Sequence, residues 1–519
     1  MSNIEQGISN IEGRFTFEEL AEWTSNAWKS FPEKVPNIGK RNFSGTRSAE
    51  KQPSCPILGI SHDTRTLKEG DVYIAIKGER FDGHDFVEQA VEKGAAGLIV
   101  EREFPNILSR RSPSAKADGI PQLIVSNAWK ALWEMAAGAR STWEGTVIGI
   151  TGSVGKTTVK ELAASVLEQK GTVAKTLGNW NNDIGLPLSM LAADRNSDFF
   201  VFELGMNHPG EIDRLAGLLK PDWALITNIG KAHTEFFHPP SLERLTIETP
   251  QPTPAYGHPS EGGELFKSPP WEGCRNGGVG LSIYHGTTLQ SLPALDGSGM
   301  TGTLERIASE KAAILNHASK ALLDADSEWF NRLKSGFPGP VVTLTEEPFV
   351  APQPGEHMIQ NTRFAATLGL ELGLSPKEVQ AGLDAFEPLP MRWQTIKKDG
   401  VLFINDAYNA NPLSMRAAIS TFAELPGEGR KFVVLGGMRE LGAESQAEHR
   451  SLGEFVDVFK FDGVITVGEL GSQIICNGIT GVEKSTAVDI LREHLRSGDR
   501  VLLKASRGER LETILEEVR

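Results

Sequence analysis

The chain has 519 residues, of which 39% are hydrophobic and 23% are charged, and its formal net charge is −14. A chain of this length needs more than one hydrophobic core, and we expect about three domains. The negative charge argues against a general basic surface for nucleic acid. No run of 18 apolar residues is present, the first 14 residues are polar, and the three cysteines form no C-x-x-C pair. We therefore expect a cytoplasmic protein with no nucleic-acid or membrane partner.

The clearest chemical signal is a glycine-rich turn between an expected strand and an expected helix. The apolar run 147–150 is typical of a buried strand, and residues 159–170 are helix-forming. The turn between them reads Gly152-Ser153-Val154-Gly155-Lys156-Thr157-Thr158. In such a turn backbone N–H groups hold phosphate, Lys156 reaches the β- and γ-phosphates, and the Thr157 hydroxyl sits on Mg²⁺. We favour a nucleotide site over a purely structural turn.

Residues 15–141 have the pattern of a first α/β unit. Polar residues gather after its expected strands, in the turns 61–65 and 77–86. Turns of this kind are where α/β units bind ligands, although ordinary turn and capping chemistry is the simpler alternative. A helix over 87–93 and a strand over 97–100 are expected to follow.

Two strands farther along the chain are followed by possible metal ligands. The strand 199–202 leads to Glu203, and the strand 224–229 leads to His233. Because the carboxyl ends of parallel strands converge on one crevice, both side chains are expected to face the phosphates at Lys156. A carboxylate and an imidazole there would suit one or two metal ions. On its own, His233 would more often be a surface or capping residue.

Changes in composition indicate the domain boundaries. Residues 238–304 show no helical or strand period, and 15 of the 32 residues from 249 to 280 are Gly, Pro or Ser. Such a segment cannot offset its ordering entropy by apolar burial, so we expect a weakly ordered insertion. The expected domains are an N-terminal domain, a central nucleotide domain and a C-terminal domain, over residues 1–141, 142–388 and 389–519.

The last of these domains again alternates strands with helices, which predicts a mostly parallel sheet. We expect strands over 401–404, 432–435, 463–467 and 501–504, and helices over 413–425 and 487–495. Polar turns follow the first and last strands, and they read Asp406-Ala407-Tyr408-Asn409-Ala410-Asn411-Pro412 and Lys504-Ala505-Ser506-Arg507.

Three motifs together resemble the Mur ligase family, the ATP-dependent amide-forming enzymes of peptidoglycan precursor synthesis, and most of all its MurF-type members. They are the glycine-rich turn 151–158, the segment Gly178-Asn179-Trp180-Asn181-Asn182-Asp183-Ile184-Gly185-Leu186-Pro187, and the turn 406–412. The resemblance implies an α/β protein of three domains, with a central P-loop ATP-binding domain and a Rossmann-like C-terminal domain. It also implies a monomer that uses ATP and Mg²⁺ to join D-alanyl-D-alanine to UDP-N-acetylmuramoyl-tripeptide through an acyl phosphate.

The resemblance also implies roles for individual residues. Those implied in catalysis are Lys156, His233, Lys311 and Arg392. Those implied in ATP binding are Gly152, Ser153, Val154, Gly155, Lys156, Thr157, Thr158, Asn361, Arg392 and Asp406. Those implied in magnesium binding are Thr157, Glu203, His233 and a carbamylated Lys311. Those implied in holding the UDP-sugar are Ser61, Thr64, Arg65, Lys77, Asp82, Gly83 and His84. Those implied in further substrate contacts are Asn179, Asn182, Tyr408, Asn409, Asn411, Lys504, Ser506 and Arg507.

The chain departs from the family pattern in places. Val154 and Met358 stand where the family usually has Asn, Gly437 stands in place of Asp, and Ala505 in place of Gly. Two alternatives stay open. A sister ligase that adds another amino acid would lack the turn 406–412, and a non-catalytic relative would bind ATP without substrate-dependent phosphate release.

Overall fold

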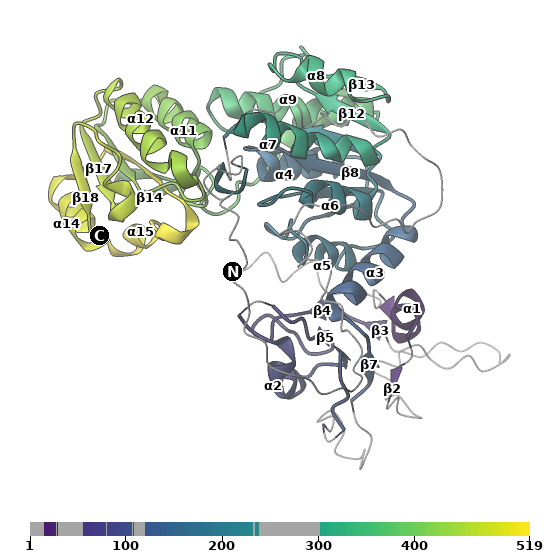
Figure 1. Ribbon diagram of the computed structural model, residues 1–519. Helices are drawn as coiled ribbons and strands as arrows, with labels where there is room; N and C mark the ends of the chain where they lie inside the picture. The colour runs from purple at the N-terminus through teal and green to yellow at the C-terminus, as the bar shows by residue number, and fades with distance from the viewer. Residues whose placement is uncertain are drawn as a thin grey trace, which may run out of the picture.

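The computed structural model describes residues 15–26, 28–29, 56–78, 80–105, 107, 120–231, 234–237 and 302–518. His233 and nearly all of the expected insertion, residues 238–301, lie outside the described residues. The described chain forms α/β units in sequence (Figure 1): the first lies below the central one in this view, and the last lies to its left. The predicted α/β class with mostly parallel sheets is confirmed.

The first unit is built on a five-stranded sheet in the order β2-β7-β6-β5-β4, in which only the edge strand β2 is antiparallel. The strands are β2 (Trp28–Lys29), β4 (Ile60–Ser61), β5 (Val72–Ile74), β6 (Gly97–Val100) and β7 (Gln122–Ile124). A separate antiparallel pair is formed by β1 (Phe15–Thr16) and β3 (Pro56–Ile57). The helices are α1 (Phe17–Trp23), η1 (Gly83–Phe86), α2 (Val87–Glu92) and α3 (Ala128–Ser141).

The central unit is a six-stranded, all-parallel sheet in the order β13-β12-β11-β8-β10-β9. Its strands are β8 (Thr146–Thr151), β9 (Val173–Lys175), β10 (Phe199–Glu203), β11 (Trp223–Ile226), β12 (Lys320–Leu323) and β13 (Val341–Thr343). Its α-helices are α4 (Lys156–Leu167), α5 (Gly185–Leu191), α6 (Glu211–Leu219), α7 (Thr303–Ala312), α8 (Phe330–Ser335), α9 (Glu356–Glu371) and α10 (Pro376–Asp384). The 3₁₀ turns are η2 (Thr234–Phe236) and η5 (Ala313–His317).

Both faces of the central sheet are covered by helices, as its apolar strands require. Along β10 the side chains alternate: Phe200 and Phe202 pack with α5 and α6, while Val201 packs with α4 and α9. Strand and helix thus reach the same edge of the sheet, where Glu203 ends β10 and α4 begins.

Two predicted boundaries in the central unit were wrong by a few residues. The helix expected from residue 159 begins at Lys156, because Gly155 adopts a left-handed conformation (φ 86°) and so starts the helix directly after the turn. The strand expected over 224–229 ends at Ile226. The next two residues turn toward the glycine-rich segment and bond it instead.

The last unit is a six-stranded sheet in the order β14-β15-β19-β16-β17-β18, in which only β14 is antiparallel. Its strands are β14 (Gln394–Lys398), β15 (Val401–Asn405), β16 (Lys431–Leu435), β17 (Gly463–Val467), β18 (Ile479–Val482) and β19 (Arg500–Lys504). Its helices are α11 (Pro412–Glu424), η6 (Gly442–Glu444), α12 (Ser445–Asp457), α13 (Gly468–Gly471), α14 (Lys484–His494), η7 (Arg507–Glu509) and α15 (Thr513–Glu517). Every strand and helix predicted for this unit is present within a few residues of its expected bounds.

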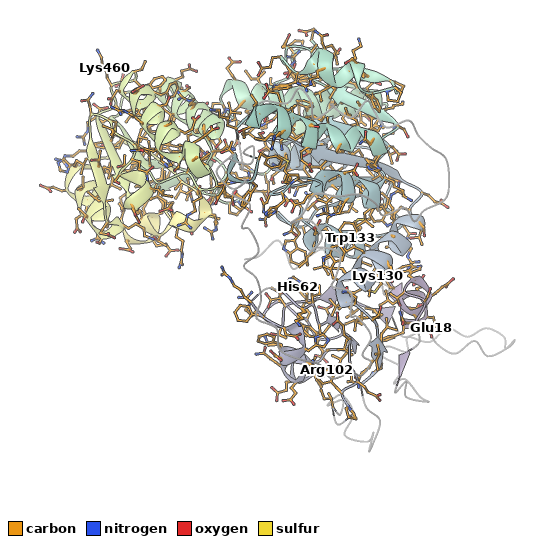
Figure 2. The ribbon with its side chains drawn as sticks, in the orientation of Figure 1. Glu18, His62, Arg102, Lys130, Trp133 and Lys460 are labelled. Carbon is orange, nitrogen blue, oxygen red and sulfur yellow. The ribbon has the colours of Figure 1, made fainter. Side chains whose placement is uncertain are left out.

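Helix α3 joins the first unit to the central one. The Trp133 indole N–H on α3 donates to the Asp183 carbonyl at 2.9 Å, and the Arg140 guanidinium donates to the last carbonyls of α6. The rings of His62 and Trp180 meet across the same junction, 6.4 Å apart. Figure 2 shows Trp133 and His62 at this level of the molecule.

The central and last units are joined by ion pairs. The Lys231 ammonium lies 2.9 Å from the carboxylates of both Glu444 and Glu448, and the Thr234 hydroxyl donates to the Leu441 carbonyl. None of the described helices combines the length and the apolarity that crossing a membrane would need.

Candidate active site

The glycine-rich turn has a backbone that only glycine fits. Gly152 and Gly155 have φ angles of 152° and 86°. A Cβ atom on Gly152 would lie 1.9 Å from the Thr227 hydroxyl oxygen, and one on Gly155 would lie 2.5 Å from Oδ1 of Asn361. Because nothing larger fits, the backbone N–H groups between these glycines stay close to the cavity.

Hydrogen bonds to the segment that follows β11 hold this turn in place. The Ser153 hydroxyl donates to the Gly230 carbonyl at 2.7 Å and accepts from the Gly230 N–H at 2.9 Å. The Val154 N–H donates to Oδ1 of Asn228 at 2.9 Å. The turn is thus tied to the neighbouring strand before any ligand arrives.

Glu203 lies beside the start of α4 at the carboxyl end of β10. The Thr157 hydroxyl donates to its Oε2 and the Asn181 amide to its Oε1, each at 2.7 Å. Its side chain is almost fully buried, with a relative exposure of 2%. A buried carboxylate with these two partners has a fixed orientation toward Thr157.

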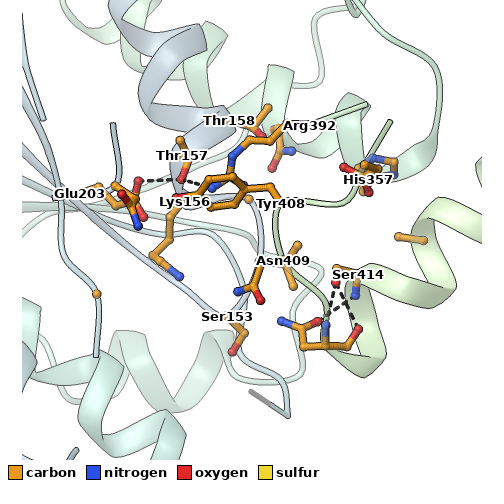
Figure 3. A pocket seen from close by; sticks show the side chains of 18 of the residues that line it. Ser153, Lys156, Thr157, Thr158, Glu203, His357, Arg392, Tyr408, Asn409 and Ser414 are labelled. Atoms are coloured by element: carbon orange, nitrogen blue, oxygen red, sulfur yellow. Dashed lines mark hydrogen bonds between the residues drawn. The ribbon is translucent and has the colours of Figure 1, made fainter. Parts of the chain in front are cut away.

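The last unit places Arg392 in contact with the glycine-rich turn. The Arg392 guanidinium donates to the Thr157 hydroxyl at 3.0 Å, and it lies over the ring of Tyr408, 4.1 Å from the ring centre. Figure 3 shows Arg392 and Tyr408 reaching toward Thr157 and Glu203. The contact between Arg392 and Thr157 closes one side of the site across the junction of two units.

The polar turn after β15 is fixed by the end of β19. The Lys504 ammonium lies 2.5 Å from Oδ2 of Asp406 and also donates to the Asn409 carbonyl. Oδ1 of Asp406 accepts from the Trp393 N–H at 3.0 Å. Asn411 caps α11 by accepting from the Ser414 N–H. The turn predicted to be polar is therefore ordered by charge and by capping.

These side chains surround one cavity of about 360 Å³. From the central unit it is lined by residues that include Ser153, Val154, Gly155, Lys156, Thr157, Thr158, Asn179, Asn181, Asn182, Glu203, His357, Met358 and Asn361. From the last unit it is lined by residues that include Arg392, Trp393, Asp406, Tyr408, Asn409, Asn411 and Lys504. Its walls combine backbone N–H, hydroxyl and cationic groups with aromatic and apolar side chains, a lining that suits a nucleotide.

Two lysines near the cavity have lowered pKa values. Burial lowers the pKa of Lys156, and Arg392 adds to this while Glu203 opposes it. Burial also lowers the pKa of Lys311 far below its ordinary value, and the charge of Lys156 adds to the effect. The Lys311 amine contacts the Met206 sulfur at 3.7 Å. An anion such as phosphate would relieve the repulsion at this end of the cavity.

Family models match all three parts of the chain. The Mur ligase family catalytic domain matches residues 56–140, the Mur ligase middle domain matches 150–245, and the Mur ligase glutamate ligase domain matches 391–507. A Bacillus subtilis protein named UDP-N-acetylmuramoyl-tripeptide–D-alanyl-D-alanine ligase is 34% identical over 496 residues, which are 93% of this chain and 98% of that protein. The chain belongs to the Mur ligase family.

Solved structures agree with this assignment. A crystal structure of MurF from Acinetobacter baumannii superposes with a TM-score of 0.71 at 26% identity, over 97% of this chain and 98% of the other. The MurF ligase of Thermotoga maritima in complex with ADP superposes with a TM-score of 0.65 at 26% identity, over 89% and 96%. The resemblance to MurF-type Mur ligases that the motifs predicted is confirmed.

In this Mur ligase most of the residues expected to bind ATP line the cavity, as do six of the eight expected substrate contacts in the central and last units. Gly152 is not among the lining residues, and Ser506 and Arg507 follow Lys504 in the turn after β19. Ser506 donates to the Ala410 carbonyl, and Arg507 pairs with Glu512. Lys311 reaches Met206, which lines the cavity. The magnesium and ATP roles of all these residues stay predictions.

The expected UDP-sugar residues lie in the first unit, away from this cavity, and several already have partners. His84 is 4% exposed: its Nδ1 lies 2.6 Å from Asp82, and its Nε2 accepts from the Glu101 N–H at 2.9 Å. The Tyr73 hydroxyl donates to the Gly83 carbonyl. His84 and Gly83 thus have a structural role in this Mur ligase, whatever they contribute to substrate binding.

The other expected residues of that group differ in exposure: Ser61 and Thr64 are buried, whereas Arg65 and Lys77 are exposed. The Thr64 hydroxyl donates to Gln89, and the Ser61 hydroxyl donates to the Asp63 carbonyl. Arg65 pairs with Asp63 at 2.6 Å while its side chain stays 87% exposed. Asp63 has its pKa lowered to about 2, chiefly by the hydrogen bonds from Arg65. Arg65, although paired with Asp63, and Lys77 are both exposed cations at these turns, and cations of this kind bind phosphate.

Several residues at the site had no predicted role. Asn181 orients Glu203, and His357 and Trp393 line the cavity with rings 6.4 Å apart. Burial lowers the pKa of His357, which favours the neutral form of its ring. Asn181 lies inside a motif rich in amides, which was a signal that it has a polar partner. Nothing in the spacing of His357 or Trp393 indicated a shared cavity.

The departures from the family pattern fit their surroundings. A Cβ atom on Gly437 would lie 2.2 Å from Cβ of Leu470 on α13, so no side chain fits there without a shift of α13. Met358 is 3% exposed and packs in the core between α4 and α9. Val154 contributes its backbone groups, which are bonded by Thr227 and Asn228. These changes are therefore compatible with an intact nucleotide site.

Proposed function

We propose that this Mur ligase is an ADP-forming ligase that joins D-alanyl-D-alanine to UDP-N-acetylmuramoyl-tripeptide. The observation that carries the proposal is the convergence of Lys156, Glu203 and Arg392 on one cavity between two units. The named activity of the Bacillus subtilis relative, 34% identical over nearly the whole of both chains, supplies the reaction. A monomeric, cytoplasmic enzyme remains our expectation.

The chemistry requires activation of a carboxylate, because a carboxylate is a poor electrophile. An oxygen of the tripeptide carboxylate attacks the γ-phosphorus of ATP, and ADP leaves with the electrons of the broken P–O bond. The dipeptide amine then attacks the acyl carbon and loses a proton, and phosphate departs from the tetrahedral intermediate. Lys156 and Arg392 would neutralise charge on the transferred group, which is the main catalytic device in phosphoryl transfer.

The residues present suit a magnesium ion. Thr157 and Glu203 provide hydroxyl and carboxylate oxygens 2.7 Å apart at the phosphate end of the cavity. Mg²⁺ prefers oxygen ligands and completes its shell with phosphate oxygens and water, so two protein ligands suffice. No cluster of three or more acidic, histidine or cysteine ligands occurs among the described residues. When bound there by Thr157 and Glu203, the ion would neutralise charge on the phosphate oxygens.

The role of a carbamylated Lys311 as a magnesium ligand remains a prediction. It is 1% exposed, and its pKa is lowered by burial and then by Lys156, which favours a neutral amine. Only the neutral amine can react with carbon dioxide, forming an N–C bond and releasing a proton. The surroundings of Lys311 therefore favour the modification.

The acyl phosphate is easily hydrolysed, and the junction between units would exclude water from it. The contact of Arg392 with Thr157 and the ion pairs of Lys231 with Glu444 and Glu448 hold the last unit against the central one. We assign the dipeptide to the side of the cavity formed by the turn 406–412. We assign the UDP-sugar to the first unit, near Arg65 and Lys77.

Phosphate release tests the proposal directly. The assay contains Mg·ATP, UDP-N-acetylmuramoyl-tripeptide and D-alanyl-D-alanine, with each omitted in turn. Release that needs all three, together with a product heavier by the dipeptide less water, is the expected result. Release with a single amino acid in place of the dipeptide would indicate a sister ligase. ATP binding without substrate-dependent release would indicate a non-catalytic relative.

A further inference from the structure

Lys160 is a buried cation with no role in the chemistry described so far. It lies one turn into α4, and its side chain is 0% exposed. Its ammonium donates to the carbonyls of Thr176 and Gly178, each at 3.0 Å, and lies 2.8 Å from the Glu161 carboxylate. A buried charge is costly unless all its donors are used, and here three partners use them.

The two carbonyls belong to the segment that leads into the cavity, residues 176–182, which we call the amide segment. The Thr176 hydroxyl accepts from the Glu203 N–H at 2.8 Å, and the Asn181 amide donates to the Glu203 carboxylate at 2.7 Å. The amide segment therefore touches Glu203 at both its backbone and its side chain. Asn179, Asn181 and Asn182 all line the cavity.

These contacts close into a ring that begins and ends on α4. Thr157 on the first turn of the helix bonds Glu203, Glu203 bonds the amide segment, and the amide segment bonds Lys160. Residues 157 and 160 are three apart, so they lie on the same face of the helix. Helix α4 thus holds the Glu203 carboxylate directly through Thr157 and indirectly through Lys160 and the amide segment.

The middle of the amide segment, at Leu177 and Gly178, is loosely packed, whereas Thr176 is 1% exposed and its N–H donates to the Val201 carbonyl. Gly178 has a positive φ of 54°, and a Cβ atom there would meet nothing within 4 Å. Leu177 is 46% exposed. The hydrogen bonds from Lys160 are therefore the main restraint on this turn that comes from the helix.

We propose that Lys160 is a positioning residue that holds the amide segment, and through it Asn181 and Glu203, in the orientation the ATP and magnesium site needs. The side chain acts through these residues and does not touch the reacting groups. The expected effect of Lys160 on magnesium binding rests on the proposed function. Its effect on the amide segment can be measured without any ligand.

Hydrogen exchange of the ligand-free protein tests the structural part. In Lys160→Met the stem is kept and the ammonium is lost, so the two carbonyls lose their donor. We expect amide exchange in residues 176–183 to speed up by about tenfold or more. Exchange in α9, which packs on the far side of α4, should stay at the wild-type rate.

Two control variants separate positioning from general weakening. Val166→Ala removes a buried side chain on the same helix, in the core with α9, and touches no member of the ring. Lys175→Met removes the other cation of Glu161, 2.6 Å away, and leaves the bonds of Lys160 to the two carbonyls. Neither should loosen the amide segment selectively. If Lys160→Met does not fold, Lys160→Gln, which keeps a neutral donor, takes its place in the same comparison.

Calorimetric titration with ADP at a series of magnesium concentrations tests the second part. We expect the magnesium concentration that half-saturates the gain in ADP affinity to rise by about fivefold or more in Lys160→Met. ADP affinity without magnesium should stay within about twofold, because the glycine-rich turn is unchanged. Lys160→Arg keeps the charge and several donors, and it should restore part of the loss.

The proposal would be overturned if residues 176–183 of Lys160→Met exchanged at the wild-type rate. It would also be overturned if exchange in these residues rose as much in Val166→Ala. An unchanged magnesium dependence would overturn the link to Glu203. Failure of the proposed function would look different: the exchange result would stand, while the wild-type protein would release no substrate-dependent phosphate.

Discussion

Two regions of this Mur ligase carry polar turns at the ends of parallel strands, and they differ in what those turns bond. Around the glycine-rich turn, Lys156, Glu203 and Arg392 come from three separate elements and point into one cavity. In the first unit, Asp82 and His84 bond one another and the nearby backbone. Similar sequence patterns thus produce a shared site in one region and a largely self-satisfied scaffold in the other.

The difference shows where substitutions should act. Substitutions of side chains that converge on the cavity should lower the rate of catalysis and leave the fold intact. Substitutions of buried side chains in the first unit should lower stability more than they weaken substrate binding. The following predictions test this contrast, and they run from the largest expected effect to the smallest.

Lys156→Ala should nearly abolish ligation. It removes the cation of the glycine-rich turn that would bind the γ-phosphate, and the expected fall in kcat is about 10³-fold or more. Lys170→Ala, which loses an exposed lysine bonded to the Leu372 carbonyl, is a matched control with near wild-type activity. The melting temperature of Lys156→Ala should equal that of the wild type. An active Lys156→Ala protein would refute the assignment of this turn.

Arg392→Ala should lower kcat by about 10²-fold. It removes the cation that the last unit places 3.0 Å from the Thr157 hydroxyl, so the phosphate end of the cavity loses its contact across the junction. Arg392→Lys should recover only part of the rate, because an ammonium cannot both bond Thr157 and stack on Tyr408. Steady-state kinetics with ATP varied would measure this.

Arg416→Ala is the matched control for that substitution. Arg416 also stacks on an aromatic ring, that of Phe455, and donates to Ser451, all within the last unit. Its loss should change stability and leave kcat within about twofold. Equal losses of kcat in the two variants would show that Arg392 acts only through the fold of its unit.

The contrast between the regions also marks what sequence could predict. The strand before the glycine-rich turn, the strand ending at Glu203 and the alternation of the last unit were predictable, because each has a strong local period. Local pattern was sufficient for these features. The bond of Asn181 to Glu203 was not predicted, and only the richness of its segment in amides indicated a polar partner.

Long-range partners were not predictable in the same way. Lys160 lies in an ordinary helical pattern, and only the folded chain shows that it is buried against two carbonyls. His84 follows a strand like any ligand-binding histidine, yet its ring is used by Asp82 and by Glu101, 17 residues away. A spacing rule does not reveal which polar side chains a fold has already satisfied.

His84→Ala should destabilise the protein more than it weakens substrate binding. The Glu101 N–H would lose its acceptor, and Asp82 would lose the imidazole ring while keeping the bond from the backbone N–H of residue 84; the expected cost is about 1–3 kcal/mol in the free energy of unfolding. Urea denaturation would measure this, with the KM for the UDP-linked substrate changing by less than about threefold. Asp85→Ala, an exposed change in the same turn, should alter stability by less than about 0.5 kcal/mol. A large rise in KM with unchanged stability would place His84 on the substrate.

Arg65→Ala should show the opposite split, with the smallest effect. Its side chain is 87% exposed, so the melting temperature should not change, while loss of a phosphate-binding guanidinium should raise the KM for the UDP-linked substrate by about tenfold. Lys130→Ala, which removes another exposed charge, on α3, should leave that KM unchanged.

The pH dependence sharpens this last test. The pKa of Asp63 is lowered to about 2, so any stability that its ionised form contributes is present above its ordinary value of 3.8 and lost only as the pH falls through about 2. Asp63 thus keeps its charge, and holds Arg65 in the same orientation, throughout the neutral range. The rise in KM caused by Arg65→Ala should therefore be constant between about pH 6 and 8. A rise that disappears within that range would mean that another titrating group, and not the Arg65 guanidinium, binds the substrate there.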